Sequence, residues 1–158
     1  MKKQLIVFIL ACLPFIGYSQ SNELPDPEAY FSALIVEDIE KSITWYTANL
    51  GFKTLNKVVS EESGFKQANL KRGNILIELI ELKTARTLKE SISNYNSKTR
   101  TIGFFKIGFQ VSDFDKWIHH LKKNEVSFHG RVVTDDQSGK KMTIIKDPDG
   151  NRIQLFEK

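Results

Sequence analysis

The hydrophobic and polar positions of this chain follow a pattern that occurs twice. Residues 31–36, FSALIV, and residues 106–111, KIGFQV, have the alternation that is typical of a strand with one buried face. Each run leads into an aspartate, Asp38 or Asp113. Because an aspartate can accept hydrogen bonds from the first amides of a helix, both are predicted to be N-caps.

The residues after each aspartate have helical periodicity. Apolar residues fall on one stripe of each predicted helix: Ile39, Ile43, Tyr46 and Leu50 in the first, and Phe114, Ile118 and Leu121 in the second. Gly51 is predicted to end the first helix, and Asn124 the second.

Three strand-like runs follow each helix. They are residues 53–60, 65–70 and 75–82 in the first copy, and residues 126–134, 141–146 and 152–156 in the second. The unit of one strand, one helix and three strands therefore occurs twice, as module one (30–82) and module two (102–158). The polar linker between them, residues 83–101, is predicted to contain a helical turn around residues 87–92.

Two stretches of the sequence resemble a known family. ALIVEDIEKSITWYTANLGF and DPDGNRIQLFEK are similar to the two ends of the vicinal oxygen chelate superfamily, and the resemblance extends over residues 30–157. That superfamily includes glyoxalase I, extradiol dioxygenases, fosfomycin-resistance enzymes and bleomycin-resistance proteins. The resemblance implies an α+β fold in which two βαβββ modules form a paired curved-sheet cup around a ligand. The cup closes within one chain or across two, and we expect a homodimer.

Strand parity predicts which side chains line that cup. In the opening strands Leu34, Val36 and the apolar positions of residues 107–111 should face the helices, so the opposite parity faces inward. The same reasoning predicts that Ile153 and Leu155 of the last strand face a helix and that Gln154 faces the cup. The predicted ligand-binding residues are Phe31, Ala33, Glu78, Lys106, Gln110, Gln154 and Phe156.

The resemblance also implies four metal-ligand positions, which here hold Phe31, Glu78, Lys106 and Gln154. A divalent metal needs lone pairs from several ligands. Phe31 offers none, and a protonated Lys106 repels a cation. Glu78 and Gln154 are the only competent residues, so we expect no metal and no other cofactor; residual metal binding remains the alternative.

Glu78 and the histidines leave alternatives open. A carboxylate between apolar neighbours is costly unless it is paired, so Glu78 is predicted either to pair with Lys106 or to contact a ligand directly. His119 and His120 are adjacent on a helix, about 100° apart, and are predicted to lie on the surface. His129 can reach the rim of the cup, and its role stays open.

The first residues have the features of a secretory signal peptide. Lys2 and Lys3 precede an apolar run, Leu5 to Ile16, and Gly17 and Ser19 are small residues at a cleavage site. We expect cleavage after Ser19, a lead-in at residues 20–29, and export to the periplasm or the outside without a membrane anchor. The single cysteine would leave with the peptide, so the mature chain would have no disulfide.

Composition sets the remaining bounds. Hydrophobic residues make up 41% and charged residues 27%, which indicates a globular protein with a sizeable core. The formal net charge of +4, lower once Lys2 and Lys3 are removed, does not indicate nucleic-acid binding.

These features predict an exported protein that binds a small organic molecule without a metal, similar to the sequestering bleomycin-resistance branch. The alternative is a metal-dependent glyoxalase-like lyase or isomerase, or a dioxygenase, that recruits another ligand such as His129. An interaction module without a small ligand is a third possibility. The identity of the ligand does not follow from the sequence.

Overall fold

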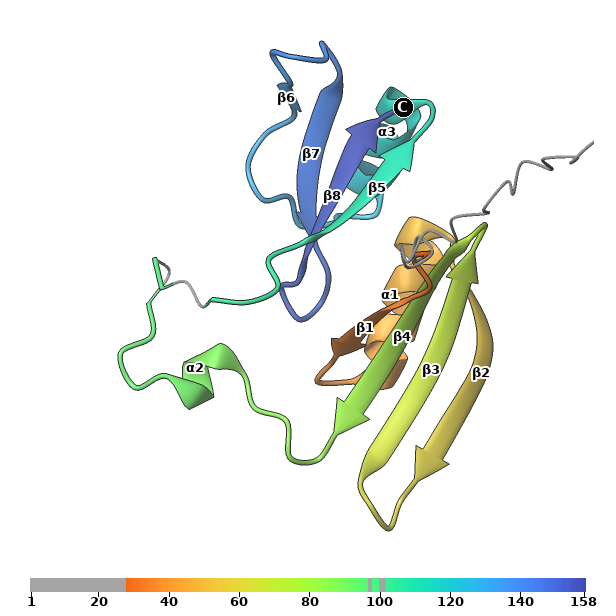
Figure 1. The fold of residues 1–158 in the computed structure, drawn as a ribbon, viewed down its shortest axis with the longest axis vertical. Helices are drawn as coiled ribbons and strands as arrows, with labels where there is room; N and C mark the ends of the chain where they lie inside the picture. The colour runs from red at the N-terminus through yellow and green to blue at the C-terminus, as the bar shows by residue number, and fades with distance from the viewer. Residues whose placement is uncertain (1–27, 97, 100–101) are drawn as a thin grey trace, which may run out of the picture.

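The protein consists of two modules, each a four-stranded sheet with one helix against it (Figure 1). The computed structural model describes residues 28–96, 98–99 and 102–158. Module one contains β1 (Ser32–Ile35), α1 (Ile39–Leu50), β2 (Lys53–Ser60), β3 (Phe65–Arg72) and β4 (Ile75–Leu82). Module two contains β5 (Ile107–Val111), α3 (Phe114–Lys123), β6 (Val133–Thr134), β7 (Lys141–Lys146) and β8 (Arg152–Glu157). The linker carries the predicted helical turn as α2 (Leu88–Ser91).

Both sheets have the same topology. Their strand orders are β1-β4-β3-β2 and β5-β8-β7-β6, and in each the opening strand pairs in parallel with the closing strand. The other neighbours are antiparallel. The α+β class and the two repeated modules, which the sequence predicted, are therefore confirmed.

The first helix begins and ends where the sequence predicted. Asp38 has extended backbone, and its carboxylate accepts hydrogen bonds from the amides of Glu40 and Lys41, each at 3.0 Å. Gly51 ends the helix with φ at 65°, a conformation that glycine adopts without steric cost.

The second helix, α3, also begins directly after its predicted aspartate, Asp113, but the predicted capping hydrogen bond does not form. Asp113 has left-handed backbone, with φ at 55° and ψ at 52°, and its side chain makes no capping hydrogen bond. An N-cap needs extended backbone to bring its side chain over the first turn, and Asp113 does not have it. The end of this helix is as predicted, at Asn124.

The predicted strand at residues 126–134 is also mostly wrong. Only Val133–Thr134 form a strand there, with one isolated bridge between Phe128 and Ile145. Gly130, with φ at 90°, turns the backbone away from the extended path between these two points. The segment nevertheless remains attached to β7, because the amide of His129 donates to the carbonyl of Ile144 at 2.7 Å.

The two modules share one hydrophobic core on the helix side of both sheets. Leu34, Val36 and Val111 are buried in it, as strand parity predicted. Phe52 of module one meets Phe109 of module two, with ring centroids 6.2 Å apart. Since the cores merge through these faces, the opposite faces of the sheets are left facing outward.

The turn between β7 and β8 fastens module two to α1. Asp149 accepts hydrogen bonds from the Glu37 amide at 3.1 Å and from the Ser42 hydroxyl at 3.3 Å. The buried Asp147 carboxylate accepts one from the Tyr46 hydroxyl at 3.0 Å. We call this set of contacts the clasp: Asp147, Asp149 and Asn151 of the turn with Glu37, Ser42 and Tyr46.

The predicted signal peptide, residues 1–19, and most of the predicted lead-in lie outside the described residues. Among the described residues, no helix has the length and apolar character needed to cross a bilayer.

Candidate functional site

The inner face of the first sheet combines apolar side chains with a few polar ones. The register places Ala33, Glu78 and Asn69 side by side across β1, β4 and β3. Ile35 and Phe31 are 56% and 55% exposed, although both are large and apolar. The Glu78 carboxylate is half-buried and accepts a hydrogen bond from the Gln67 side chain.

The inner face of the second sheet holds the other predicted residues. Gly108, Gln154 and Ile144 form one row across β5, β8 and β7, and Gln110 and Phe156 lie in the next row. The Gln154 side chain donates to the Met142 sulfur at 2.9 Å. The structure thus brings Gln110, Gln154 and Phe156 together on one face, as parity predicted.

The predicted pairing of Glu78 with Lys106 does not form within one chain. Among the described residues, no ion pair involves either side chain. Glu78 bonds to Gln67 instead, and the Lys106 ammonium lies 6.0 Å from the centre of the Phe105 ring. Glu78 lies on β4 of the first sheet and Lys106 lies just before β5 of the second, and the described strands of the two sheets share no hydrogen-bonded pair.

The inner faces offer few metal-ligating groups. Across residues 28–96, 98–99 and 102–158, no three side chains of His, Cys, Asp or Glu are grouped so as to hold a metal ion. Glu78 and Gln154, the two competent residues at the family's ligand positions, lie on different sheets. One chain by itself therefore does not bring them together.

One of the helix histidines has a structural role that the sequence did not predict. The His120 Nε2 lies 3.2 Å from the carbonyl oxygen of Ala48 and 3.1 Å from that of Asn49. Both carbonyls belong to the last turn of α1, where helix carbonyls lack intrahelical partners. His120 therefore helps to join α3 to α1.

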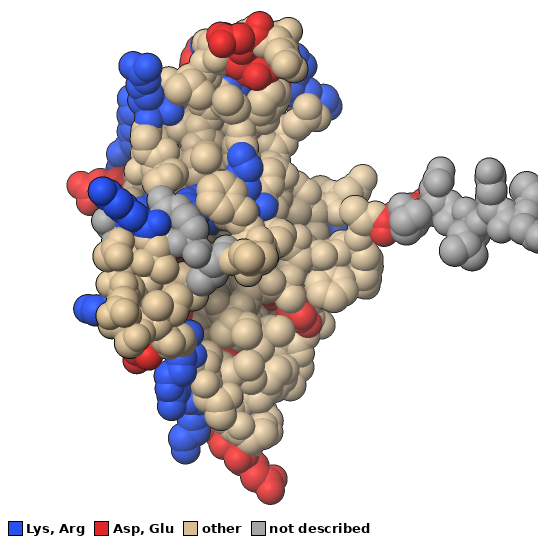
Figure 2. Space-filling model, turned by 60° about the vertical axis from the view of Figure 1, so that its left-hand side comes forward, with Lys and Arg blue, Asp and Glu red and all other residues tan. Residues whose placement is uncertain are grey.

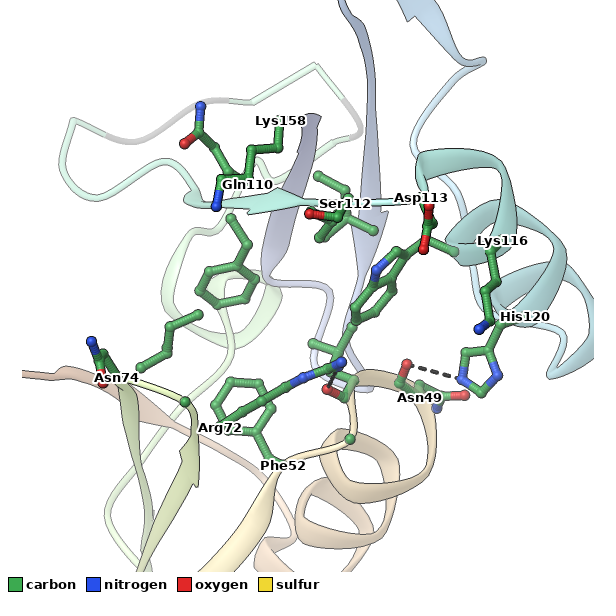
Figure 3. A pocket seen from close by; sticks show the side chains of 18 of the residues that line it. Asn49, Phe52, Arg72, Asn74, Gln110, Ser112, Asp113, Lys116, His120 and Lys158 are labelled. Atoms are coloured by element: carbon green, nitrogen blue, oxygen red, sulfur yellow. Dashed lines mark hydrogen bonds between the residues drawn. The ribbon is translucent and has the colours of Figure 1, made fainter.

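A groove lies between the modules, mainly on the side of the helices, and Gln110 from the inner face of the second sheet also lines it. Its volume is about 910 Å³. Figure 3 shows Phe52, Arg72 and Asn74 of module one lining it, together with Asp113, Lys116 and His120 of module two. The groove faces the β3–β4 turn, which is much shorter than the β7–β8 turn of the clasp. Because the shorter turn brings fewer atoms to the contact between the modules, it leaves the space that forms the groove.

Two polar side chains of the groove, Arg72 and His120, help to hold the modules together. The Arg72 guanidinium donates to the Leu50 carbonyl and lies 4.5 Å from the centre of the Trp117 ring. His120 makes the contacts with α1 described above. The inner faces, by contrast, carry side chains that no contact between the modules uses. We therefore take the inner faces, and not the groove, as the candidate site.

Buried ionisable groups are concentrated in the clasp. Burial raises the pKa of the Tyr46 hydroxyl, and the neighbouring Asp147 raises it further. Burial also raises the pKa of the Asp147 carboxyl, against the lowering effect of its hydrogen bonds from Asn151 and Tyr46. Both groups serve the contact between the modules, so their perturbation does not mark a reaction centre.

Comparison with known proteins identifies the family. The family model of the Glyoxalase/Bleomycin resistance protein/Dioxygenase superfamily matches residues 30–155. The chain belongs to this superfamily. It is 27% identical over 126 residues to the protein YwkD of Bacillus subtilis (strain 168), covering 79% of this chain and 92% of the relative. To YaeR of Escherichia coli (strain K12) it is 25% identical over 131 residues, covering 82% and 95%.

Solved structures share the fold. The glyoxalase family protein from Enterococcus faecalis superimposes with a TM-score of 0.70 at 24% identity, covering 82% of this chain and 97% of that one. A glyoxalase I mutant from Zea mays gives a TM-score of 0.64 at 21% identity, covering 80% of this chain and 44% of that one. At these identities the likeness concerns the fold and not the activity.

Proposed function

We propose that this protein is an exported binding protein that holds a small organic molecule between the inner faces of its sheets. The binding cup forms when the first sheet of one copy meets the second sheet of another, so the working unit is a homodimer. The protein binds its ligand without a metal, in the manner of the sequestering bleomycin-resistance branch of its superfamily.

The observation that carries this proposal is the exposed apolar character of the first sheet's inner face and of the segment that leads into β5. Ile35 on β1 and Phe31 just before it are more than half exposed, as are Phe104 and Phe105 just before β5. Large apolar side chains that gather on an exposed face of a soluble domain mark a binding surface. Beside them lie a few polar groups, Glu78, Gln110 and Gln154, and this mixture is typical of a small-molecule site.

The experiment is a thermal-shift screen of residues 20–158 against a library of small organic molecules. A ligand should raise the melting temperature, and Ala33→Trp should remove that shift because the indole fills the inner face of the first sheet. Ser93→Trp, in the linker, is the matched control and should keep the shift. Hits that respond equally to both variants would place binding elsewhere and refute the proposal.

The metal-free state is supported by the residues at the family's ligand positions, two of which are Phe31 and Lys106. Elemental analysis of the dialysed protein should find well below one divalent metal per chain. About one zinc, nickel, iron or manganese ion per chain, lost in Glu78→Ala, would instead favour a metal-dependent enzyme of the glyoxalase type.

The exported state is supported by the order of Lys2 and Lys3, the apolar run and the small residues before Gln20. Mass spectrometry of the protein from its native host should find a mature chain that begins at Gln20. An intact chain that begins at Met1 in the cytoplasmic fraction would contradict export.

A further inference from the structure

Three cations lie in a row at one end of the inner face of the second sheet. Lys146 on β7 is the register partner of Arg152 on β8. Lys106 lies next to Arg152 on the other side, because the residues that follow them, Ile107 and Ile153, are register partners. All three share the parity of Gln154, whose neighbours Ile153 and Leu155 are buried against the helix. The row therefore points into the proposed cup.

In the part of the chain that the structure describes, no ion pair involves any of these three cations. The ion pairs of the described residues join Lys57 to Glu40, Lys66 to Glu81 and Lys141 to Asp115. The buried Nε atom of Arg152 has no hydrogen-bond acceptor in the described part of the chain. Like charges side by side on a sheet are destabilising, and a buried guanidinium donor without an acceptor carries a further cost.

Other Lys and Arg side chains are dispersed over the rest of the surface. Figure 2 shows Lys and Arg side chains in several separate groups on the face it presents. The row of Lys106, Arg152 and Lys146 differs from such groups because strand register places the three cations side by side on one face of the sheet.

An aromatic ring and an unfilled space lie beside the row. The Arg152 guanidinium carbon lies 4.6 Å from the centre of the Phe105 ring, and the Lys106 ammonium lies 6.0 Å from it. Gly108, the next inward position after Lys106, has no heavy atom within 4 Å of the place a Cβ would take. Its φ is not positive, so the backbone does not require glycine there. A glycine inside a strand often marks the close approach of a ligand or another chain.

We infer that the ligand of the cup is a small aromatic anion, a molecule with a carboxylate or a similar oxyanion group. Its anionic group contacts Lys106 and Arg152, with Lys146 adding positive charge, and its ring lies over Gly108 beside Phe105. This inference rests on the proposed binding function and assigns the chemical class of the ligand. A second copy that brings in Glu78 of the partner subunit would balance at most one of the three cations.

Two fluorescent probes that differ only in charge test the inference. The first, 8-anilinonaphthalene-1-sulfonate, carries a sulfonate, and the second, N-phenyl-1-naphthylamine, is the same molecule without it; both report apolar binding sites. Lys106→Met should weaken binding of the sulfonate about tenfold or more, since charge-assisted contacts are worth about 1.5–3 kcal/mol each. The neutral probe should change by less than about twofold. Lys106→Arg should retain the sulfonate affinity.

Two control variants show where the probes bind and distinguish failure of the anionic-ligand inference from failure of the proposed cup. Lys122→Met, on the exposed side of α3, removes the same charge outside the cup and should leave both affinities unchanged. Gly108→Val fills the space beside the row and should weaken both probes. If both probes bind and respond to Gly108→Val while the sulfonate ignores Lys106→Met, the anionic ligand is refuted but the binding cup stands. If neither probe binds, or neither responds to Gly108→Val, the cup itself fails and the inference fails with it.

Discussion

At the scale of single residues, the hydrogen bonds of Asp147 show a side chain whose role is to stabilise the structure. The Asp147 carboxylate accepts hydrogen bonds from the amides of Asp149 and Asn151, from the Asn151 side chain and from the Tyr46 hydroxyl. One buried group thus closes its own turn and binds the other module. The DPDGN motif is therefore explained by the contact between the modules.

Removing this acceptor should be costly. Asp147→Ala leaves several buried donors without a partner and should lower the free energy of unfolding by about 3 kcal/mol or more. Tyr46→Phe removes a single hydrogen bond and should cost about 1 kcal/mol. Urea denaturation measures both. Asp136→Ala, in an exposed loop, is the control. If Asp147→Ala lowers the free energy of unfolding no more than Asp136→Ala does, the structural role of the clasp is contradicted.

A second residue-scale prediction concerns pH. A hydrogen bond from the Lys66 ammonium, 2.7 Å away, lowers the pKa of the Glu81 carboxyl below its ordinary value of 4.5, and the amide of Ile39 lowers it further. A lowered pKa in the folded state stabilises the protein above pH 4.5, and this contribution is lost as the pH falls through the folded value. Both side chains are partly exposed, so it should be below about 1 kcal/mol.

Glu81→Gln tests this contribution. The variant keeps an acceptor for Ile39 but loses the charge, so it should be less stable than the native protein near neutral pH. The difference should shrink as the pH falls below 4.5 and through the lowered folded-state pKa of Glu81. The raised pKa of Asp147 acts in the opposite direction, destabilising the fold as the pH rises, but it is common to both proteins and cancels in the comparison. A difference that grows toward low pH would contradict the assignment.

At the scale of elements, the two helices show that matching sequences need not have matching local structure. Asp38 and Asp113 occupy the same place in the two repeats, yet only Asp38 caps its helix. Residues near Asp113 also line the groove between the modules. Aspartate adopts left-handed backbone more readily than most residues, so the same residue type can occur in both conformations.

The two aspartates should therefore respond differently to mutation. Asp38→Ala should lower stability by about 1 kcal/mol, because the amides of Glu40 and Lys41 lose their acceptor. Asp113→Gly should leave stability unchanged or raise it slightly, because glycine adopts a φ of 55° without the strain that a Cβ brings. Chemical denaturation compares them, and a large loss for Asp113→Gly would show that its carboxylate has a stabilising partner.

At the scale of the whole molecule, the proposed cup takes one sheet from each of two copies. The modules pack through their helix sides, and among the described residues β1 and β5 each have a hydrogen-bonded neighbour on one edge alone. Unpaired strand edges beside exposed apolar faces favour association with another chain. A second copy supplies both a complementary edge and a complementary face, which is the physical basis of the proposed homodimer.

The homodimer can be tested by sedimentation. The native protein should sediment as a dimer at micromolar concentration, and Ile35→Asp should shift it toward monomer by placing a charge on the inner face of the first sheet. Leu88→Asp is the matched control, because Leu88 is similarly exposed, at 49% against 56% for Ile35, but lies on α2 outside the sheets. Equal effects of the two variants, or a native monomer, would contradict the shared cup.

The sequence alone determined the local structure of this protein and the direction of its side chains. Periodicity and turn residues are local signals, so they located α1, most strands and the inward parity of residues such as Gln154. The tertiary structure decided which faces meet. It separated Glu78 from Lys106, placed the β7–β8 turn against α1, and brought Lys106, Arg152 and Lys146 into one row. These outcomes depend on contacts between residues far apart in the chain, and no local pattern encodes the partner that such a residue finds.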